Sequence, residues 1–88
     1  MKTLNQIMEE ERGNRIELFK DIFSQRLKDL REERHLSQAT VANKLGCAVS
    51  TYANWEQGRR EPSVYDIFNI LWVFEIEANE LFDISDIV

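Results

Sequence analysis

The chain has 88 residues, a single cysteine and a formal net charge of −5 at pH 7. This length predicts one small domain with a limited core, which a second subunit would help to stabilise. One cysteine excludes an internal disulfide, and no apolar run approaches the roughly 18 residues that a membrane span needs. Because the N-terminus also lacks a signal-peptide pattern, we expect a cytoplasmic protein.

The charge is unevenly distributed along the chain. Residues 25–60 carry seven Lys and Arg against four acids, whereas residues 61–88 carry seven acids and neither Lys nor Arg. An acidic chain is unusual for a DNA-binding protein, since neutralisation of phosphates supplies much of the affinity. The positive excess in the central segment is compatible with a nucleic-acid interface there, although a solvated charged surface is the simpler alternative.

Residues 1–13 form an N-terminal extension, which we expect to be flexible or a short helix because Gly13 interrupts its helical pattern. Asn14 and Glu17 have the spacing of a capping box, so a long helix is predicted from there to about Arg34. Its apolar stripe comprises Ile16, Phe19, Phe23, Leu27 and Leu30, and it is widened by Leu18 and Ile22. This surplus requires cover from the N-terminal residues, the C-terminal tail or a second subunit.

Two short helical patterns flank a tight turn in the middle of the chain. Ser37 is the candidate N-cap of the first, and Gly46 stands just after its last apolar residue, where a left-handed residue commonly ends a helix. The second pattern, at about 49–56, places Tyr52 and Trp55 on its core side. Two helices joined by a turn of three or four residues describe a helix-turn-helix.

An ordered set of short motifs across residues 23–82 resembles the Cro/CI-type (XRE) helix-turn-helix family, which includes the phage repressors. The motifs are Leu-x-x-Leu-Arg at 27–31, Leu-Ser-Gln at 36–38, Ala-x-Lys-Leu-Gly at 42–46, Ser-Thr at 50–51, Trp-Glu-x-Gly-x-Arg-x-Pro-Ser at 55–63 and Glu-Leu-Phe at 80–82. The resemblance implies an all-α, five-helix, lambda-repressor-like domain over residues 14–83. The domain would have a longer first helix, the short N-terminal extension and an apolar C-terminal tail at 84–88. The third helix would lie in the DNA major groove.

The resemblance also implies which residues contact DNA. These are Gln38, Ala48, Val49, Ser50, Thr51, Asn54, Arg59 and Arg60. Ala48 stands where the family commonly has a capping Ser or Thr, and Val49 replaces a long polar side chain. Valine can still touch a thymine methyl group but cannot form a hydrogen bond with a base. Ser50 and Asn54 therefore remain as the base readers that form hydrogen bonds.

Three of these residues are expected to contact the phosphate backbone. Gln38 begins the helix after Ser37, where free N–H groups can face a phosphate, and it would also support the third helix. Arg59 and Arg60 lie on a loop that Pro62 separates from the next helix. The simpler alternatives are that Gln38 is only a favourable polar residue in the first turn of its helix and that Arg59 and Arg60 only promote solubility.

Arg31 and Glu56 occupy positions that the phage repressors of this family pair, so the resemblance implies a clamp between the first and third helices. The alternative is that both side chains are solvated. No cofactor or metal site is predicted, because His35 and Cys47 stand on different elements without further ligands. No catalytic group is expected, because the histidine lacks a nucleophile and an orienting acid.

The most apolar segment runs from 64 to 74, after a capping box formed by Ser63 and Asp66. Its predicted core stripe is Val64, Ile67, Leu71 and Phe74. Tyr65, Phe68 and Trp72 extend the apolar surface over positions that the family fills with polar residues. A monomer seldom leaves such a patch in water, so Tyr65 and Trp72 are predicted at a dimer interface. Packing of both terminal extensions onto this helix would explain the patch equally well.

These features predict a sequence-specific DNA-binding transcriptional regulator, in particular a small phage- or plasmid-type repressor. It would act as a homodimer on a palindromic operator in double-stranded DNA. The alternative is a protein-interaction module, such as an antirepressor or an antitoxin partner, that binds a protein through the helix at 64–74. Acidic flanks, the apolar surplus and Val49 in the reading face favour that alternative.

Overall fold

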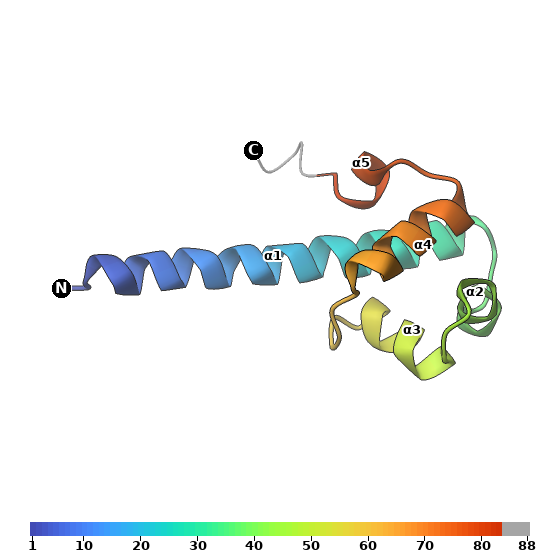
Figure 1. Cartoon of the computed structure of the whole chain (residues 1–88), viewed down its shortest axis with the longest axis horizontal. Coiled ribbons are helices and arrows are strands. Elements are labelled where there is room, and N and C mark those ends of the chain that lie inside the picture. The colour runs from blue at the N-terminus through green and yellow to red at the C-terminus, as the bar shows by residue number, and fades with distance from the viewer. Residues whose placement is uncertain (84–88) are drawn as a thin grey trace.

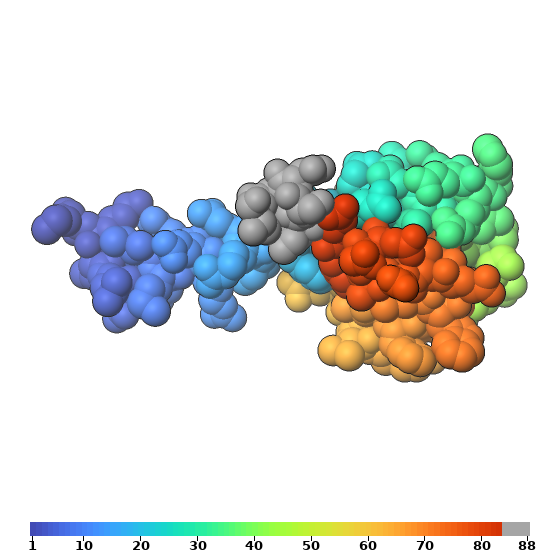
Figure 2. Space-filling model, turned by 90° about the horizontal axis from the view of Figure 1, so that it is seen from above, coloured from blue at the N-terminus to red at the C-terminus, as the bar shows by residue number. Residues whose placement is uncertain are grey.

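The computed structural model describes residues 1–83, which form five α-helices and no strand (Figure 1). The helices are α1 (Leu4–Glu33), α2 (Gln38–Leu45), α3 (Val49–Glu56), α4 (Val64–Phe74) and α5 (Ala78–Leu81). The C-terminal half of α1 packs with the other four helices, while its N-terminal half projects away from them (Figures 1 and 2). The molecule is therefore elongated, with dimensions of 51 × 26 × 20 Å. The predicted all-α fold with a long first helix is confirmed, and the apolar tail at 84–88 lies outside the described residues.

α1 is one continuous helix of 30 residues, so the helix start expected at Asn14 is wrong. The helix begins after Thr3, whose hydroxyl accepts a hydrogen bond from the Gln6 N–H at 3.2 Å, while the Gln6 side chain accepts one from the Thr3 N–H at 2.8 Å. This reciprocal capping box stabilises the first turn. Gly13 lies within the helix, where a glycine costs only about 1 kcal/mol relative to alanine and does not by itself break hydrogen bonding.

The core forms where the C-terminal half of α1 meets the other helices. Its buried members are Phe23, Leu27, Leu30, Val41, Ala42, Leu45, Tyr52, Trp55, Ile70, Phe74 and Leu81. The apolar stripe predicted for α1 is buried from Phe23 onward, but Ile16 is exposed because α1 has left the domain there. On α4, the prediction that Val64 lies in the core is wrong, because this residue is 85% exposed in the first turn. Ile70, which was not predicted, is buried instead.

α5 is held against α1 by aromatic stacking and one hydrogen bond. The ring of Phe82, just after α5, stacks on Phe19 at 5.8 Å and on Phe23 at 6.2 Å between centroids. The Arg26 guanidinium donates to the carbonyl oxygen of Glu80 at 2.9 Å. These contacts cover part of the apolar surplus of α1 from within the chain.

Helices α1 to α4 end in the same backbone motif, with a left-handed residue just after each helix. The left-handed residues are His35, Gly46, Gly58 and Glu75, with φ angles of 54°, 75°, 71° and 56°. After Gly46, for example, the Cys47 N–H donates back to the Ala42 carbonyl at 3.0 Å. This is the Schellman arrangement, and the left-handed conformation expected for Gly46 is confirmed. His35 and Glu75 adopt it with a side chain, which costs about 1–2 kcal/mol.

Replacing Glu75 or His35 with glycine should therefore stabilise the domain. We expect Glu75→Gly and His35→Gly each to raise the free energy of unfolding by about 0.5–1 kcal/mol, the relief of backbone strain less the added chain entropy of glycine. Denaturant unfolding followed by circular dichroism measures the change. Glu75→Ala is the matched control, since it removes the same charge without the freedom of glycine, and equal stabilisation by both variants at position 75 would contradict the account.

Candidate nucleic-acid interface

The contact predicted between Arg31 and Glu56 is present and joins α1 to the end of α3. The Arg31 guanidinium donates two hydrogen bonds to the Glu56 carboxylate, at 2.7 and 3.0 Å, in a two-pronged ion pair. The side chains are only 14% and 4% exposed, respectively. Such a pair is strongest when further hydrogen bonds satisfy the remaining polar atoms of both groups.

Those further hydrogen bonds come from α2 and from the turn that precedes it. A third guanidinium bond runs from Arg31 to the Leu36 carbonyl at 2.9 Å, and the Gln38 side-chain amide donates to Glu56 at 3.2 Å. Gln38, predicted to touch the phosphate backbone, thus has its amide engaged with Glu56. The pair and its partners tie three helices together at one point.

The charge states of this cluster follow from its surroundings. Burial acts to raise the pKa of Glu56, but the hydrogen bonds from Arg31, the nearby Tyr52 hydroxyl and the hydrogen bond from Gln38 together outweigh it and hold that pKa below its ordinary value. The same hydrogen bonding to Glu56 raises the pKa of Arg31. Burial, followed by the nearby carboxylate, raises the pKa of the Tyr52 hydroxyl, which faces the pair without reaching good hydrogen-bond geometry. Glu56 is therefore the group whose titration matters at accessible acidic pH.

Four polar side chains that the sequence reasoning did not single out bind carbonyl oxygens near the ends of other helices. They are Ser24 to Trp55 at 2.8 Å, Arg26 to Glu80 at 2.9 Å, Arg34 to Phe74 at 3.3 Å and Asn69 to Leu45 at 2.8 Å. The last carbonyls of a helix lack partners within it, so these bonds satisfy groups that would otherwise rely on water. Two of them tie α3 to α1 and α2 to α4, and the other two hold α5 and the end of α4. No local motif marks such residues, because their partners lie 24 to 54 positions away in sequence.

The residues predicted to read bases lie on α3, at its start and along its length. Ala48, Val49 and Ser50 are exposed at the N-terminal end, and Thr51 and Asn54 are half-buried. As expected from its side chain, Ala48 gives α3 no capping hydrogen bond. The exposed end of α3 is thus apolar at Val49 and polar at Ser50, while the buried side carries Tyr52 and Trp55.

Arg59 and Arg60 are exposed on the loop after α3, next to the half-buried Asn54. The Arg59 N–H donates to the Asn54 carbonyl at 2.9 Å, and the left-handed Gly58 turns the chain at this point. Within residues 1–83, neither guanidinium forms an ion pair. Both charges are therefore available to an anionic ligand beside α3.

Part of the positive charge of residues 25–60 serves the fold. Arg26 and Arg34 bind backbone carbonyls, and the Arg34 guanidinium also lies over the Phe74 ring at 5.1 Å. With Arg31 paired to Glu56, three of the seven basic side chains in this segment have structural contacts. The exposed remainder is Lys28, Lys44, Arg59 and Arg60. The basic surface is smaller than the sequence count indicates.

Two residues considered for other chemistry occupy ordinary positions. Cys47 is half-buried against the core, and burial raises the pKa of its thiol. His35 forms the exposed turn between α1 and α2. Over residues 1–83, no group of three or more His, Cys, Asp or Glu is placed to hold a metal ion. None of the helices in that range is long and apolar enough to cross a membrane.

The outer face of α4 carries a second exposed surface, formed by Val64, Tyr65, Phe68 and Trp72. Tyr65 is 68% and Trp72 73% exposed, and the rings of Phe68 and Trp72 stack at 6.1 Å. The exposure that the dimer prediction required is therefore present at both residues. What covers this surface stays a prediction.

The Arg31–Glu56 pair makes stability depend on pH in a defined direction. Because the pKa of Glu56 is lowered by folding, its contribution is complete above the ordinary value of 4.5 and is lost as the pH falls below it. We expect Glu56→Gln to lower the free energy of unfolding at pH 7 by about 2–3 kcal/mol, since Arg31 is left buried without a countercharge.

Denaturant titrations between pH 3 and 7 measure this effect. The difference in stability between the wild type and Glu56→Gln should shrink as the pH falls through 4.5. Glu61→Gln, at an exposed position, is the control and should change stability little. A difference that stays constant across this pH range would contradict the assigned role of the ion pair.

The chain was compared with known proteins. A family model described as helix-turn-helix matches residues 27–81. The chain is 32% identical over 65 residues to the cryptic phage CTXphi transcriptional repressor RstR of Vibrio cholerae, a match that covers 74% of this chain and 59% of that protein. It is 33% identical over 60 residues to the uncharacterized HTH-type transcriptional regulator YqaE of Bacillus subtilis strain 168, covering 68% of this chain and 52% of the relative.

A third relative is the HTH-type transcriptional regulator AnsR of the same strain, 38% identical over 56 residues, with 64% of this chain and 48% of the relative covered. The chain thus spans about half the length of the relatives it matches. No solved structure gives a significant match. The matched region, residues 27–81, contains α2 to α5 and the ion-paired end of α1. The chain therefore belongs to the Cro/CI-type helix-turn-helix family.

Proposed function

We propose that this chain is a DNA-binding transcriptional regulator that places α3 in the major groove. The observation that carries the proposal is the fixed α3, held by the Glu56 carboxylate against α1 and α2. Its N-terminal end is exposed, and its C-terminal end is followed by Arg59 and Arg60, which form no ion pair within residues 1–83. A recognition helix must be rigidly positioned to read base edges, and phosphate contacts set its register. The family membership supports the same function.

The base-reading set is small. Val49 can contact a thymine methyl group, Ser50 can pair with several base edges, and Asn54 can bind adenine through two hydrogen bonds. α3 carries no arginine or lysine, so the commonest reader of guanine is absent from it. We expect the half-buried Thr51 to lie nearer the DNA backbone than the base edges. We therefore expect a binding site in which A·T pairs dominate the positions read by α3.

The phosphate contacts would come from around α3. Arg59 and Arg60 lie on one side of α3, and Lys44 lies near the end of α2. Gln38 would act mainly by holding Glu56, since its amide is already engaged. The N-terminus of α2 still offers N–H groups to a phosphate. Electrostatic contacts of this kind supply affinity without sequence preference.

The regulator is proposed to be a small repressor, because one of its relatives is named as the transcriptional repressor of a cryptic phage. It would act in the cytoplasm as a homodimer, with two copies of α3 on the half-sites of a palindromic operator about 34–36 Å apart. No catalytic role is proposed.

The second candidate function is a protein-interaction module of the antirepressor or antitoxin type. The stacked and exposed Phe68 and Trp72 on α4 favour it, because apolar patches of this kind mark protein interfaces. An electrophoretic mobility-shift assay with the DNA upstream of the gene that encodes this chain distinguishes the two functions. Absence of binding together with a co-purifying protein partner would favour the module.

Two substitutions test the proposed roles of α3 and the loop. Asn54→Ala should relax selectivity at one base position, whereas Arg60→Ala should weaken binding to all sequences about equally, because the first removes a base contact and the second a phosphate contact. Selection of bound duplexes from a random pool measures both effects. Glu61→Gln serves as the control that changes charge next to Arg60 without removing a cation.

Two results of this selection would contradict the proposal. One is a wild type that enriches no sequence. The other is an Asn54→Ala variant whose selected sequences match those of the wild type at every position. In the second case the contact assigned to Asn54 would be wrong even if α3 enters the groove.

A further inference from the structure

The projecting half of α1 has no cover from the rest of the described chain. Every residue from 1 to 18 is exposed, yet this segment carries several large apolar side chains. Leu4 is 71% and Met8 56% exposed. Helices without tertiary packing are marginally stable in water, so a surface that covers this segment would stabilise it.

One line of residues runs along this part of α1 on a single face. Its members are Leu4, Met8, Glu11, Arg15, Leu18 and Ile22, at alternating steps of four and three. At about 100° per residue, they fall within a band roughly 80° wide. We call this line the α1 stripe. Its spacing is that of the a and d positions of a helix pair.

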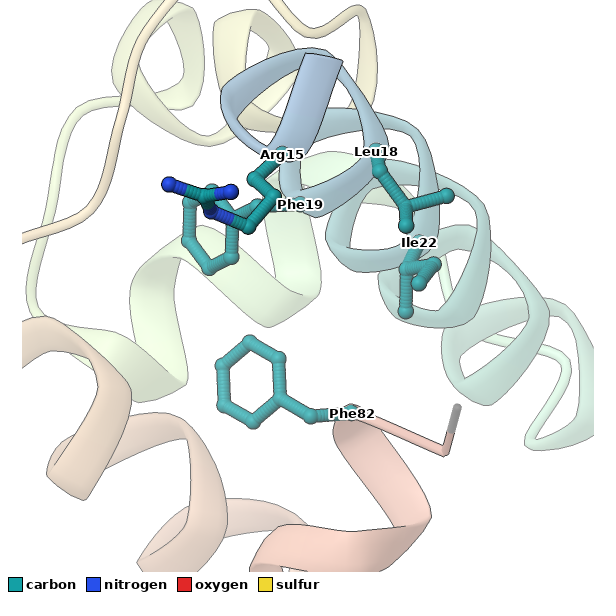
Figure 3. Close-up of a pocket in the computed structure, with 5 residues that line it drawn as sticks. All are labelled: Arg15, Leu18, Phe19, Ile22 and Phe82. Atoms are coloured by element: carbon teal, nitrogen blue, oxygen red, sulfur yellow. The ribbon is translucent and has the colours of Figure 1, made fainter. Parts of the chain in front are cut away.

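The C-terminal end of the α1 stripe opens into a hollow of about 390 Å³. Leu18, Phe19 and Ile22 line it from α1, and Phe82 closes it from the end of α5 (Figure 3). Arg15 marks the edge toward the projecting half. The hollow can accept one or two apolar side chains from another helix.

The stripe is self-complementary when reversed. It is apolar at both ends and carries one acid and one base at its centre. If a second copy runs antiparallel with its Arg15 opposite Glu11, then Leu4 faces the partner's Ile22 and Met8 faces the partner's Leu18. We propose that the α1 stripe is the self-association surface of this protein, with two copies paired antiparallel in this register.

Charge complementarity decides the direction. Neither Glu11 nor Arg15 forms an ion pair within residues 1–83. In the antiparallel register each glutamate meets the partner's arginine, so the pair has two such contacts by symmetry. A parallel pairing would instead place Glu11 beside the partner's Glu11 and Arg15 beside the partner's Arg15, which disfavours association.

This surface leaves the proposed DNA face free. Ser24, which bonds to the α3 carbonyl of Trp55, points about 160° around α1 from the stripe. Each helix-turn-helix unit would lie beyond the N-terminal end of the partner's α1, at opposite ends of the pair. The inference goes beyond the proposed function, and its test uses no DNA, so a dimer that fails to bind DNA would overturn only the proposed function.

Charge reversal at the centre of the stripe tests the pairing. Equilibrium sedimentation of the wild type should give about twice the 10.4 kDa chain mass as concentration rises. Glu11→Arg alone and Arg15→Glu alone should each weaken association about tenfold, since each creates two like-charge contacts across the interface. Mixing the two variants in equal amounts should restore the dimer, because each hetero-pair then has two opposite-charge contacts.

The double variant Glu11→Arg/Arg15→Glu should also associate as the wild type does. Glu17→Arg is the control, with a comparable charge change on the side of α1 that faces away from the stripe, and it should leave association unchanged. Circular dichroism of each variant checks that α1 remains helical. Cys47→Ala chains carrying Met8→Cys or Leu18→Cys should cross-link when mixed under oxidising conditions and not when alone.

Several outcomes would overturn the proposal. One is a wild type that stays monomeric at every concentration. The proposal would be overturned in the same way if dimers formed only after removal of residues 84–88, because that result would assign the cover of the stripe to the tail. Dissociation by Trp72→Ala with no effect of the charge variants would assign the dimer to α4 instead. Cross-linking of Met8→Cys chains with one another would show a parallel pairing.

Discussion

The ion pair between Arg31 and Glu56 is the contact on which the arrangement of the helix-turn-helix depends. It lies at the end of α3, and its remaining hydrogen-bonding capacity is taken up by Gln38 and by the Leu36 carbonyl. A buried charge pair adds little stability over an apolar contact, but it is specific in direction and distance. α3 is only eight residues long and buries two side chains, Tyr52 and Trp55, in the core. The pair adds a constraint at the end opposite the exposed Val49.

The acidic net charge and the proposed DNA binding are reconciled by the distribution of contacts. Arg26 and Arg34 act within the fold, where they satisfy carbonyls near helix ends. The exposed Arg59 and Arg60 follow α3, whereas residues 61–88 carry seven acids and neither Lys nor Arg. A polyanion would therefore be attracted in one orientation and repelled in others.

Local signals in the sequence predicted most of the helices, and the family resemblance predicted the ion pair, while the other long-range contacts escaped prediction. Gly46 was predictable because a left-handed helix end needs no partner elsewhere in the chain. The predicted start of α1 is wrong because Gly13 does not interrupt the helix: one glycine costs less than a broken helix, and the capping box of Thr3 sets the start of the helix. Val64 was assigned to the core by its spacing, which cannot reveal where neighbouring helices end. Ser24 and its partner are 31 positions apart, a contact that only the folded chain specifies.

The central claim is that this acidic domain binds duplex DNA through a small basic surface beside α3. The most direct measurement is the dissociation constant for a selected duplex as monovalent salt rises from 50 to 200 mM. Release of several counterions from the phosphates should weaken binding by orders of magnitude, with a linear dependence of log K on log salt. An affinity that does not change with salt, or no measurable binding at 50 mM, would contradict the account.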